Sequence, residues 1–352
     1  MSISLTHRAA RWLWASRAPT ARLARVALLP LAVVYAAAIE ARLLAYRWGL
    51  VAVHRLPLPA VGVGNLSVGG AGKTPVAAWV AQEIARAGLK PGILLRGYGA
   101  DEVLVHQRLV PDAIVVANPD RVAGAAVARE QGAAALVLDD AFQRLDVGRD
   151  LNLALVAAEQ ARLPHWPLPA GPWRERWGAL RRADAILVTR KRVGAEEARR
   201  LAEQLTVDWA PRPVAVAHLA LTGFTGMRSG DTHPGEVLRG RRTLAVAGVA
   251  DPESFGVQVR ATGASVRLAG FPDHHPYDPT DVGRLVREAA GAAADYVVVT
   301  EKDAVKLRAL WPSEAAEPLV ARQALRWEWN GDAITSALAR LLSTARTPSN
   351  HT

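Results

Sequence analysis

Short apolar runs alternate with segments of helical periodicity along most of the chain. The runs cover residues 59–63, 93–95, 113–117, 134–138, 152–156 and 185–189. Apolar runs of this length, separated by helical segments and turn residues, are typical of parallel strands connected by helices. The pattern therefore predicts an α/β fold built on a doubly wound parallel sheet.

A second set of alternating elements follows a linker at residues 207–213, which is rich in proline and tryptophan. Its apolar runs and helical segments lie at residues 243–249, 253–262, 265–268, 280–290 and 296–299. This repetition predicts a second, smaller α/β domain. We place the two α/β domains at residues 54–210 and 211–345.

The first 53 residues have a different pattern, in which tryptophan and arginine precede an apolar run. The arginines lie at positions 8, 11, 17, 22 and 25. The run Val26–Ile39 is 14 residues long and contains Pro30, whereas crossing a bilayer takes about 20 apolar residues. We interpret residues 1–53 as a helical arm that lies in the headgroup region of a membrane; a buried helix of the main domain is the alternative. Glu40 and Arg42 follow the run directly, so a cleaved signal peptide is not expected.

Composition narrows the possible functions. The 352 residues include no cysteine, which excludes a disulfide framework, thiol catalysis and zinc bound by cysteine. The net charge of +10 favours anionic partners such as a nucleotide, an acidic lipid surface or a phosphorylated substrate. An arginine-rich surface without a dedicated partner is the alternative. The basic residues form no tract interleaved with aromatic residues, so nucleic acid is not an expected partner.

A glycine-rich turn between the first apolar run and the next helical segment gives the strongest chemical signal. Its residues are Ser67, Val68, Gly69, Gly70, Ala71, Gly72, Lys73 and Thr74. Glycines allow backbone N–H groups to close around phosphate oxygens, and the following helix N-terminus favours negative charge. Lys73 can reach the β- and γ-phosphates, and the hydroxyl of Thr74 can bind Mg²⁺. Ser67 stands where the usual phosphate-loop pattern has glycine.

Carboxylates follow two of the predicted strands. Asp139 and Asp140 end the run 134–138, which is where a nucleotide-binding sheet places Mg²⁺ ligands. The alternative is a strand that ends in a polar turn. Asp101 and Glu102 follow a glycine-flanked turn, where a carboxylate can accept a proton from an attacking hydroxyl or can be solvated surface.

Two further stretches carry candidate binding groups. Arg121 opens a predicted helix, where its planar fork can hold a phosphate or simply be exposed. The Pro/Gly/Trp-rich stretch 166–176 is predicted to be an irregular binding loop. His274 and His275 follow Asp273, but their spacing and the lack of a third ligand disfavour zinc. They are interpreted as orienting or exposed groups.

Eight ordered blocks of this sequence resemble the tetraacyldisaccharide 4′-kinase family, the lipid A 4′-kinases of Gram-negative inner membranes. The blocks are GNLSVGGAGKTP, RGYG, DE, DDAFQ, LPAGPWRE, AVAGVADPESF, FPDHHPY and TEKDAVK. The resemblance covers residues 20–340. It implies a P-loop kinase domain, a smaller α/β domain and a membrane-associated N-terminal helix. It also implies transfer of the γ-phosphate of ATP to the 4′-hydroxyl of a tetraacylated glucosamine disaccharide 1-phosphate.

The resemblance also implies roles for individual residues. Ser67 through Thr74 would form the nucleotide loop, where the family often has a hydroxyl residue at the place of Ser67, and Asp139 and Asp140 would be the carboxylates on the Mg²⁺ side. Asp101 would be the catalytic base, supported from the second domain by His274. The residues implied near phosphate or sugar are Arg121, Gln143, Arg174 and Glu175.

Some positions depart from the family pattern. The stretch between RGYG and Asp101 is short, and Ala100 and Val103 flank Asp101-Glu102 where the family commonly has glycine and proline. Phe142 and Arg144 stand where leucine and histidine are common. No role is assigned to Arg144.

The expected cofactors are ATP and Mg²⁺, and the expected substrate is a lipid disaccharide. The resemblance implies a location at the inner membrane, and the positive charges of the arm indicate its cytoplasmic face. We expect a monomer. The alternative function is that of a P-loop regulatory or metal-insertion NTPase, in which hydrolysis switches partner binding.

Overall fold

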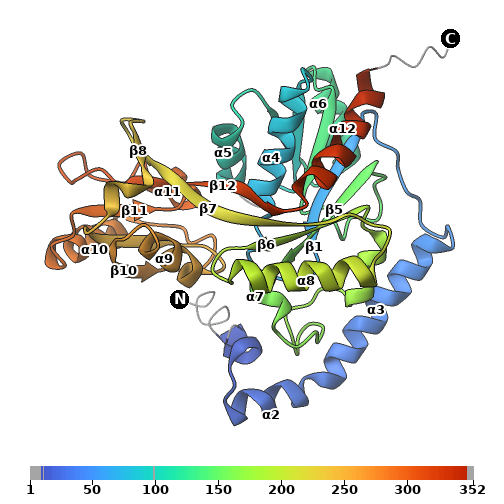
Figure 1. Cartoon of the computed structure of the whole chain (residues 1–352), viewed down its shortest axis with the longest axis horizontal. Coiled ribbons are helices and arrows are strands. Elements are labelled where there is room, and N and C mark those ends of the chain that lie inside the picture. The colour runs from blue at the N-terminus through green and yellow to red at the C-terminus, as the bar shows by residue number, and fades with distance from the viewer. Residues whose placement is uncertain (1–8, 11, 98–99, 347–352) are drawn as a thin grey trace. The chain divides into compact units, whose positions relative to one another are not determined.

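The computed structural model describes residues 9–10, 12–97 and 100–346, which fall into two compact units (Figure 1). The first unit contains the described residues within Arg8–His218 and Trp327–Thr352, and the second contains Leu219–Arg326. This division differs from the predicted limits, 54–210 and 211–345, because the first unit extends to His218 and also includes the chain from Trp327 onward.

The first unit is a parallel sheet with the strand order β7-β6-β5-β1-β4-β2-β3. Its strands are β1 (Ala60–Asn65), β2 (Pro91–Leu95), β3 (Ile114–Ala117), β4 (Ala135–Asp139), β5 (Leu151–Ala157), β6 (Ala185–Arg190) and the start of β7 (Val214–Gly226). Strands β1, β2 and β4 are buried throughout, as expected for a parallel sheet covered on both faces. The prediction of an α/β fold on a parallel sheet is confirmed.

Helices connect these strands and cover the sheet. They are α4 (Lys73–Arg86), α5 (Ala100–Leu109), α6 (Arg121–Glu130), α7 (Ala158–Ala161), the 3₁₀ helix η1 (Trp177–Arg182), α8 (Ala195–Asp208) and α12 (Gly331–Arg346). Helix α12 lies beside α4, where Leu338 and Leu342 line a pocket together with Glu83 and Arg86. The end of β12 (Leu319–Trp329) adds Trp327, which packs edge-on against Trp79 of α4 at 5.1 Å.

The relation of β1 to β4 positions the candidate site. Val63 of β1 is paired with Asp139 of β4, so the chain enters the glycine-rich turn beside the first strand-end carboxylate. Gly64 permits this closeness, since a Cβ there would lie 2.5 Å from the backbone nitrogen of Phe142. Carboxyl ends of parallel strands are where ligands bind in open α/β sheets.

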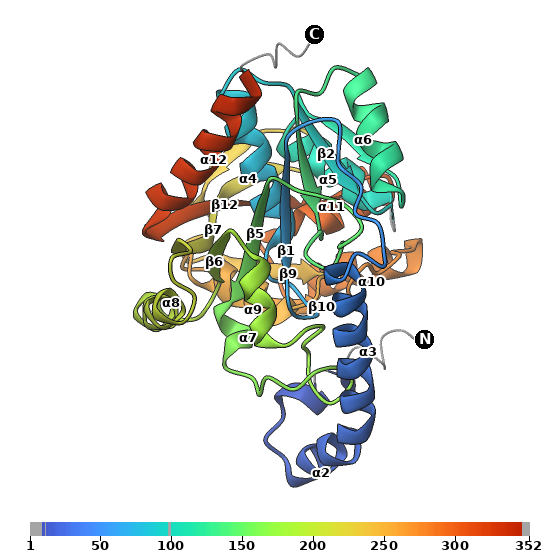
Figure 2. The ribbon, with the colours of Figure 1, turned by 90° about the vertical axis from the view of Figure 1, so that its right-hand side faces the viewer.

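The arm consists of α2 (Pro19–Ala27) and α3 (Leu29–Arg47), which extend away from the sheet of the first unit (Figure 2). Helix α3 has 19 residues, because Pro30 sits in its first turn and does not interrupt it. It is long and apolar enough to cross a membrane, with a mean hydropathy of 1.5 and only 11% of its apolar window buried. That exposure argues against the alternative of a buried core helix. Two of the arginines predicted to belong to the arm, Arg8 and Arg11, lie outside the described residues.

The second unit has the strand order β10-β9-β11-β12-β7, with β8 paired antiparallel to β7. Its further elements are β8 (Thr232–Pro234), η2 (Gly235–Leu238), β9 (Arg242–Ala247), α9 (Pro252–Arg260), β10 (Ser265–Gly270), α10 (Pro279–Gly291), β11 (Tyr296–Val299) and α11 (Glu301–Leu307). Two apolar clusters, around Leu244 and Phe224, form its core.

Candidate nucleotide and phosphoryl-transfer site

The predicted phosphate loop lies between β1 and α4. Gly69 and Gly72 have φ values of 118° and 83°, a left-handed conformation that side chains other than glycine rarely adopt. Gly72 is the N-cap of α4, and Lys73 is its first residue. The loop therefore has the strand, turn and helix N-terminus that a phosphate site requires.

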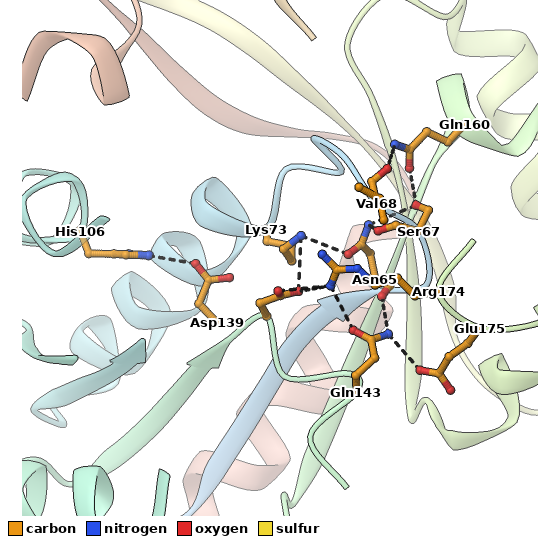
Figure 3. A network of polar contacts seen from close by, with 11 residues as sticks. Asn65, Ser67, Val68, Lys73, His106, Asp139, Gln143, Gln160, Arg174 and Glu175 are labelled. Carbon is orange, nitrogen blue, oxygen red and sulfur yellow. Dashed lines mark hydrogen bonds and ion pairs between the residues drawn. The ribbon is translucent and has the colours of Figure 1, made fainter. Parts of the chain in front are cut away.

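A polar brace holds the start of this loop (Figure 3). The side-chain amide of Asn65 donates to the backbone oxygen of Ser67 at 2.8 Å, and its Oδ1 accepts from Lys73 Nζ at 3.1 Å. The Ser67 hydroxyl bonds Gln160, which in turn donates to the backbone oxygen of Val68. Ser67 thus replaces the usual glycine with a hydroxyl that ties the loop to α7.

Strand β6 and the residue directly after it also contact the loop. The hydroxyl of Thr189 donates to the oxygen of Ala71 at 2.9 Å, and Lys191 Nζ donates to the oxygen of Gly70 at 2.9 Å. Val68 N donates to the oxygen of Pro172, which belongs to the predicted binding loop 166–176. The phosphate loop is consequently held from both sides.

Asp140 is the centre of a charged network. Lys73 Nζ lies 3.4 Å from its Oδ1, and Arg174 Nη1 donates to the same oxygen at 3.2 Å and to Gln143 Oε1 at 3.3 Å. Burial raises the pKa of Asp140, but the charges of Lys73 and Arg174 outweigh it and hold this pKa below its ordinary value. Asp140 also has a φ of 53°, a strained conformation for aspartate that is common at functional sites.

Asp139 has a different environment. It is 8% exposed, and its Oδ2 lies 3.1 Å from Nε2 of His106, a fully buried residue of α5 (Figure 3). Sequence reasoning did not find His106. A lone histidine among the apolar positions of a helix was the only signal, and its partner lies 33 residues away.

Asp101 lies in the first turn of α5, a helix that the sequence analysis did not predict, and its side chain is partly buried. Tyr98 and Gly99 of the preceding RGYG block are outside the described residues. Asp101 precedes His106 by five residues on the same helix, which corresponds to a rise of about 7.5 Å. Thr74 follows Lys73 in α4 and is partly exposed.

The residues expected near the sugar or phosphate differ in accessibility. Arg121 is 1% exposed, and its Nη1 donates to the backbone oxygen of Asn118. Burial, and to a smaller extent the positive charge of Arg144, lowers the pKa of Arg121 to about 10. The guanidinium of Arg121 is therefore still charged at neutral pH. Glu175 is also buried and bonds Gln143 and Arg182, so it acts on the site through Gln143.

The loop that carries His274 belongs to the second unit. His274 has a φ of 57° and a half-exposed side chain, whereas His275 bonds Asp281 at 2.6 Å and packs against Phe271 and Tyr277. The two histidines are therefore distinct, and His275 is a packing residue. The predicted support of Asp101 by His274 stays a prediction.

A buried polar cluster fixes the base of that loop. Asp303 is fully buried and accepts from Tyr277 at 2.9 Å, from Thr300 at 2.6 Å and from the backbone N–H of Gly248 at 3.0 Å. Burial raises the pKa of the Asp303 carboxyl in spite of these donors. A Cβ at Gly248 would lie 2.7 Å from Asp303 Oδ1, so this position requires glycine.

Asp139 and Asp140 are the candidate Mg²⁺ ligands of the first unit. Among the described residues, no group of three or more histidine or acidic side chains is arranged as a metal site. However, Asp139 Oδ1 is buried and has no hydrogen-bond partner in that part of the chain. Mg²⁺ commonly takes one or two carboxylates and completes its shell with phosphate and water, so Asp139, Asp140 and Thr74 fit this ion.

Comparisons with known proteins show which family this chain resembles along its length. The family model for tetraacyldisaccharide-1-P 4′-kinase matches residues 24–343. The chain is 34% identical to the tetraacyldisaccharide 4′-kinase of Pelobacter propionicus, over 84% of this chain and 86% of that protein. It is 35% identical to the protein of that name from Anaeromyxobacter sp. strain K, over 95% and 96% of the two chains.

A solved structure is also similar to this chain. It is the "apo" form of LpxK from Aquifex aeolicus in complex with ATP, which aligns with a TM-score of 0.70 at 25% identity. The alignment covers 90% of this chain and 99% of the other.

Proposed function

Because the chain belongs to the tetraacyldisaccharide-1-P 4′-kinase family, we propose that it phosphorylates the 4′-hydroxyl of a tetraacyl glucosamine disaccharide 1-phosphate. The γ-phosphate of ATP is the donor. The observation that carries the proposal is the convergence of Lys73, Arg174 and Asp140 on the phosphate loop. Two cations and one carboxylate at a helix N-terminus suit a triphosphate with its metal ion.

The residues of the loop act mainly by positioning and by neutralising charge. Phosphoryl transfer passes through a loose transition state, with charge spread over the equatorial oxygens of the transferred group. The loop N–H groups and Lys73 bind the β- and γ-phosphate oxygens, while Arg174 stays oriented by Asp140 and Gln143. When bound, Mg²⁺ would neutralise further negative charge on the phosphates, and Asp139, Asp140 and Thr74 are the residues that would hold it.

Asp101 and His274 complete the proposed chemistry. The 4′-oxygen forms a bond to the γ-phosphorus as the bond from that phosphorus to the bridging oxygen of ADP breaks. The hydroxyl proton passes to the carboxylate of Asp101, which His274 orients. The exposure of His274 and the fixed role of His275 support the choice of the first histidine.

The arm gives the kinase its proposed location. Leu23, Val33, Val34 and Trp48 are large apolar side chains that are more than half exposed on α2, on α3 and directly after α3. Arg22, Arg42 and Arg47 lie among them, a combination that suits the cytoplasmic leaflet with its anionic lipids. We propose that the protein acts as a monomer on the cytoplasmic face of the inner membrane.

Incubation with γ-labelled ATP and either the lipid disaccharide or water alone tests the function. Label should appear in the lipid, with little free phosphate when the lipid is omitted. Rapid ATP hydrolysis without any lipid labelling would instead support the alternative of a regulatory NTPase. Lys73→Ala serves as the inactive control.

A further inference from the structure

A buried histidine lies behind the strand-end carboxylate of the nucleotide site. Helix α5 packs on β2, β3 and α4, and it places His106 within the unit at 0% exposure. Nε2 of His106 lies 3.1 Å from Oδ2 of Asp139. None of the proposed catalytic steps uses this histidine.

The hydrogen bond has a defined direction. An ionised carboxylate only accepts, so Nε2 of His106 carries the hydrogen and donates it to Asp139. Nδ1 of His106 is buried and has no partner among the described residues. The tautomer with its hydrogen on Nε2 alone therefore leaves no buried donor unpaired.

The other oxygen of Asp139 lacks a partner. Oδ1 is buried and makes no hydrogen bond within the described part of the chain, although a buried carboxylate is costly unless both oxygens are satisfied. Asp139 lies between His106 and Lys73 (Figure 3). Its strand neighbour Val63 leads into the phosphate loop. His106 of α5 thus holds one oxygen of Asp139, and the other oxygen is unpartnered on the residue that precedes Asp140 of the nucleotide site.

We propose that His106 is a positioning residue, which fixes the carboxylate of Asp139 so that Oδ1 serves the Mg²⁺ of the bound nucleotide. The inference rests on the proposed kinase function, in which Asp139 lies on the metal side. Outer partners that orient a metal-binding carboxylate typically change metal affinity by about 10- to 100-fold when they are removed. His106 supplies that orientation from a helix that also carries Asp101.

Three substitutions at one position separate orientation from packing. His106→Leu keeps an apolar volume and removes the donor. His106→Gln keeps an N–H at nearly the distance of Nε2, whereas the shorter side chain of His106→Asn does not reach Asp139. The matched control is Val105→Ala, because Val105 is equally buried on α5 but has no polar contact with the site.

The readout is metal-dependent nucleotide binding, which requires no lipid substrate. Affinity for a fluorescent ATP analogue is measured in EDTA and across a Mg²⁺ titration, and free Mn²⁺ is counted by electron paramagnetic resonance. We expect His106→Leu and His106→Asn to need about tenfold more metal, with affinity in EDTA unchanged, and His106→Gln to resemble the wild type. Val105→Ala should lower thermal stability and leave the metal dependence unchanged.

Equal metal dependence in wild type, His106→Asn and His106→Leu would overturn the proposal, and so would a loss shared with Val105→Ala. If His106→Leu does not fold, the comparison of Gln with Asn decides. Failure of the wild type to phosphorylate the lipid, with its Mg²⁺-dependent binding intact, would count against the proposed function and not against the role of His106.

Discussion

The two units use polar residues at strand ends in opposite ways. In the first unit Lys73, Asp140 and Arg174 form a partly exposed charged network beside the phosphate loop. In the second unit Asp303 lies fully buried and joins Gly248, Tyr277 and Thr300. The charged side chains of the first arrangement are accessible to a ligand. The hydrogen bonds of the second arrangement hold a loop in place. The strand ends of the same α/β architecture therefore form a candidate binding site in one unit and a buried support for a loop in the other.

The largest expected effect comes from removing the cation of the exposed network. Lys73→Ala should lower the rate of phosphoryl transfer by about 10³-fold, because the lysine stabilises charge that develops on the phosphates. Transfer from labelled ATP measures the rate, and circular dichroism checks the fold. The exposed Lys90 provides a control, and Lys90→Ala should retain nearly full activity. Substantial activity in Lys73→Ala would contradict the assignment of the phosphate site.

The adjacent histidines of the second unit should respond differently. His274→Ala should reduce kcat by about 10²-fold with little change in stability, as expected for a group that supports a general base. His275→Ala removes the bond to Asp281 and the contacts with Phe271 and Tyr277, so it should mainly lower the melting temperature. Steady-state kinetics and thermal unfolding measure both variants. The reverse result would exchange the roles of the two residues.

Asp303→Asn tests whether the buried cluster stabilises the loop next to it. The carboxylate accepts from three donors, and an amide group turns one acceptor into a donor, so we expect a loss of about 2 kcal/mol in unfolding free energy. Hydrogen exchange should show faster exchange near Gly248 and Tyr277 and unchanged protection in β1 and β4. An equal loss of protection in the first unit would show that the cluster does not act locally.

The smallest expected effect is the contribution of Asp140 to the free energy of unfolding, which should depend on pH. The pKa of Asp140 is lowered, since Lys73 and Arg174 outweigh the effect of burial, so its ionised form stabilises the fold above the unfolded pKa. That contribution disappears as the pH falls through the folded-state pKa. Because the side chain is 42% exposed, Asp140→Asn should cost only about 0.5 kcal/mol at neutral pH and nothing in strong acid. Urea unfolding across this pH range measures the difference, and a cost that grows on acidification would have the wrong sign.

Periodicity predicted β1 to β6 and β9 to β11, most clearly where buried parallel strands such as β1, β2 and β4 form short apolar runs. It missed α5, whose Asp101, Glu102 and His106 interrupt the apolar pattern over one short helix. It also missed β7 and β12, since each strand begins in one unit and ends in the other and its surroundings change along the way.

The candidate site was predictable where chemistry follows a local motif. The phosphate loop and Asp139-Asp140 are such cases, and the structure shows Lys73 beside Asp140. The brace of Ser67 by Gln160 and the contact of His106 with Asp139 depend on strand order, which brings distant residues together. No spacing in the sequence encodes those pairs.

One contact of the arm has a practical consequence for anyone who shortens this enzyme to make it easier to handle. The Tyr35 hydroxyl of α3 donates to the backbone oxygen of Arg174 at 3.0 Å, and the N–H of Arg174 donates to Leu66 at the entrance of the phosphate loop. Deleting the arm would thus remove a hydrogen bond to the backbone of Arg174, whose side chain contacts Asp140 beside the phosphate loop. A variant without the arm would then have kinetic constants that differ from those of the full-length enzyme, even where its solubility is higher.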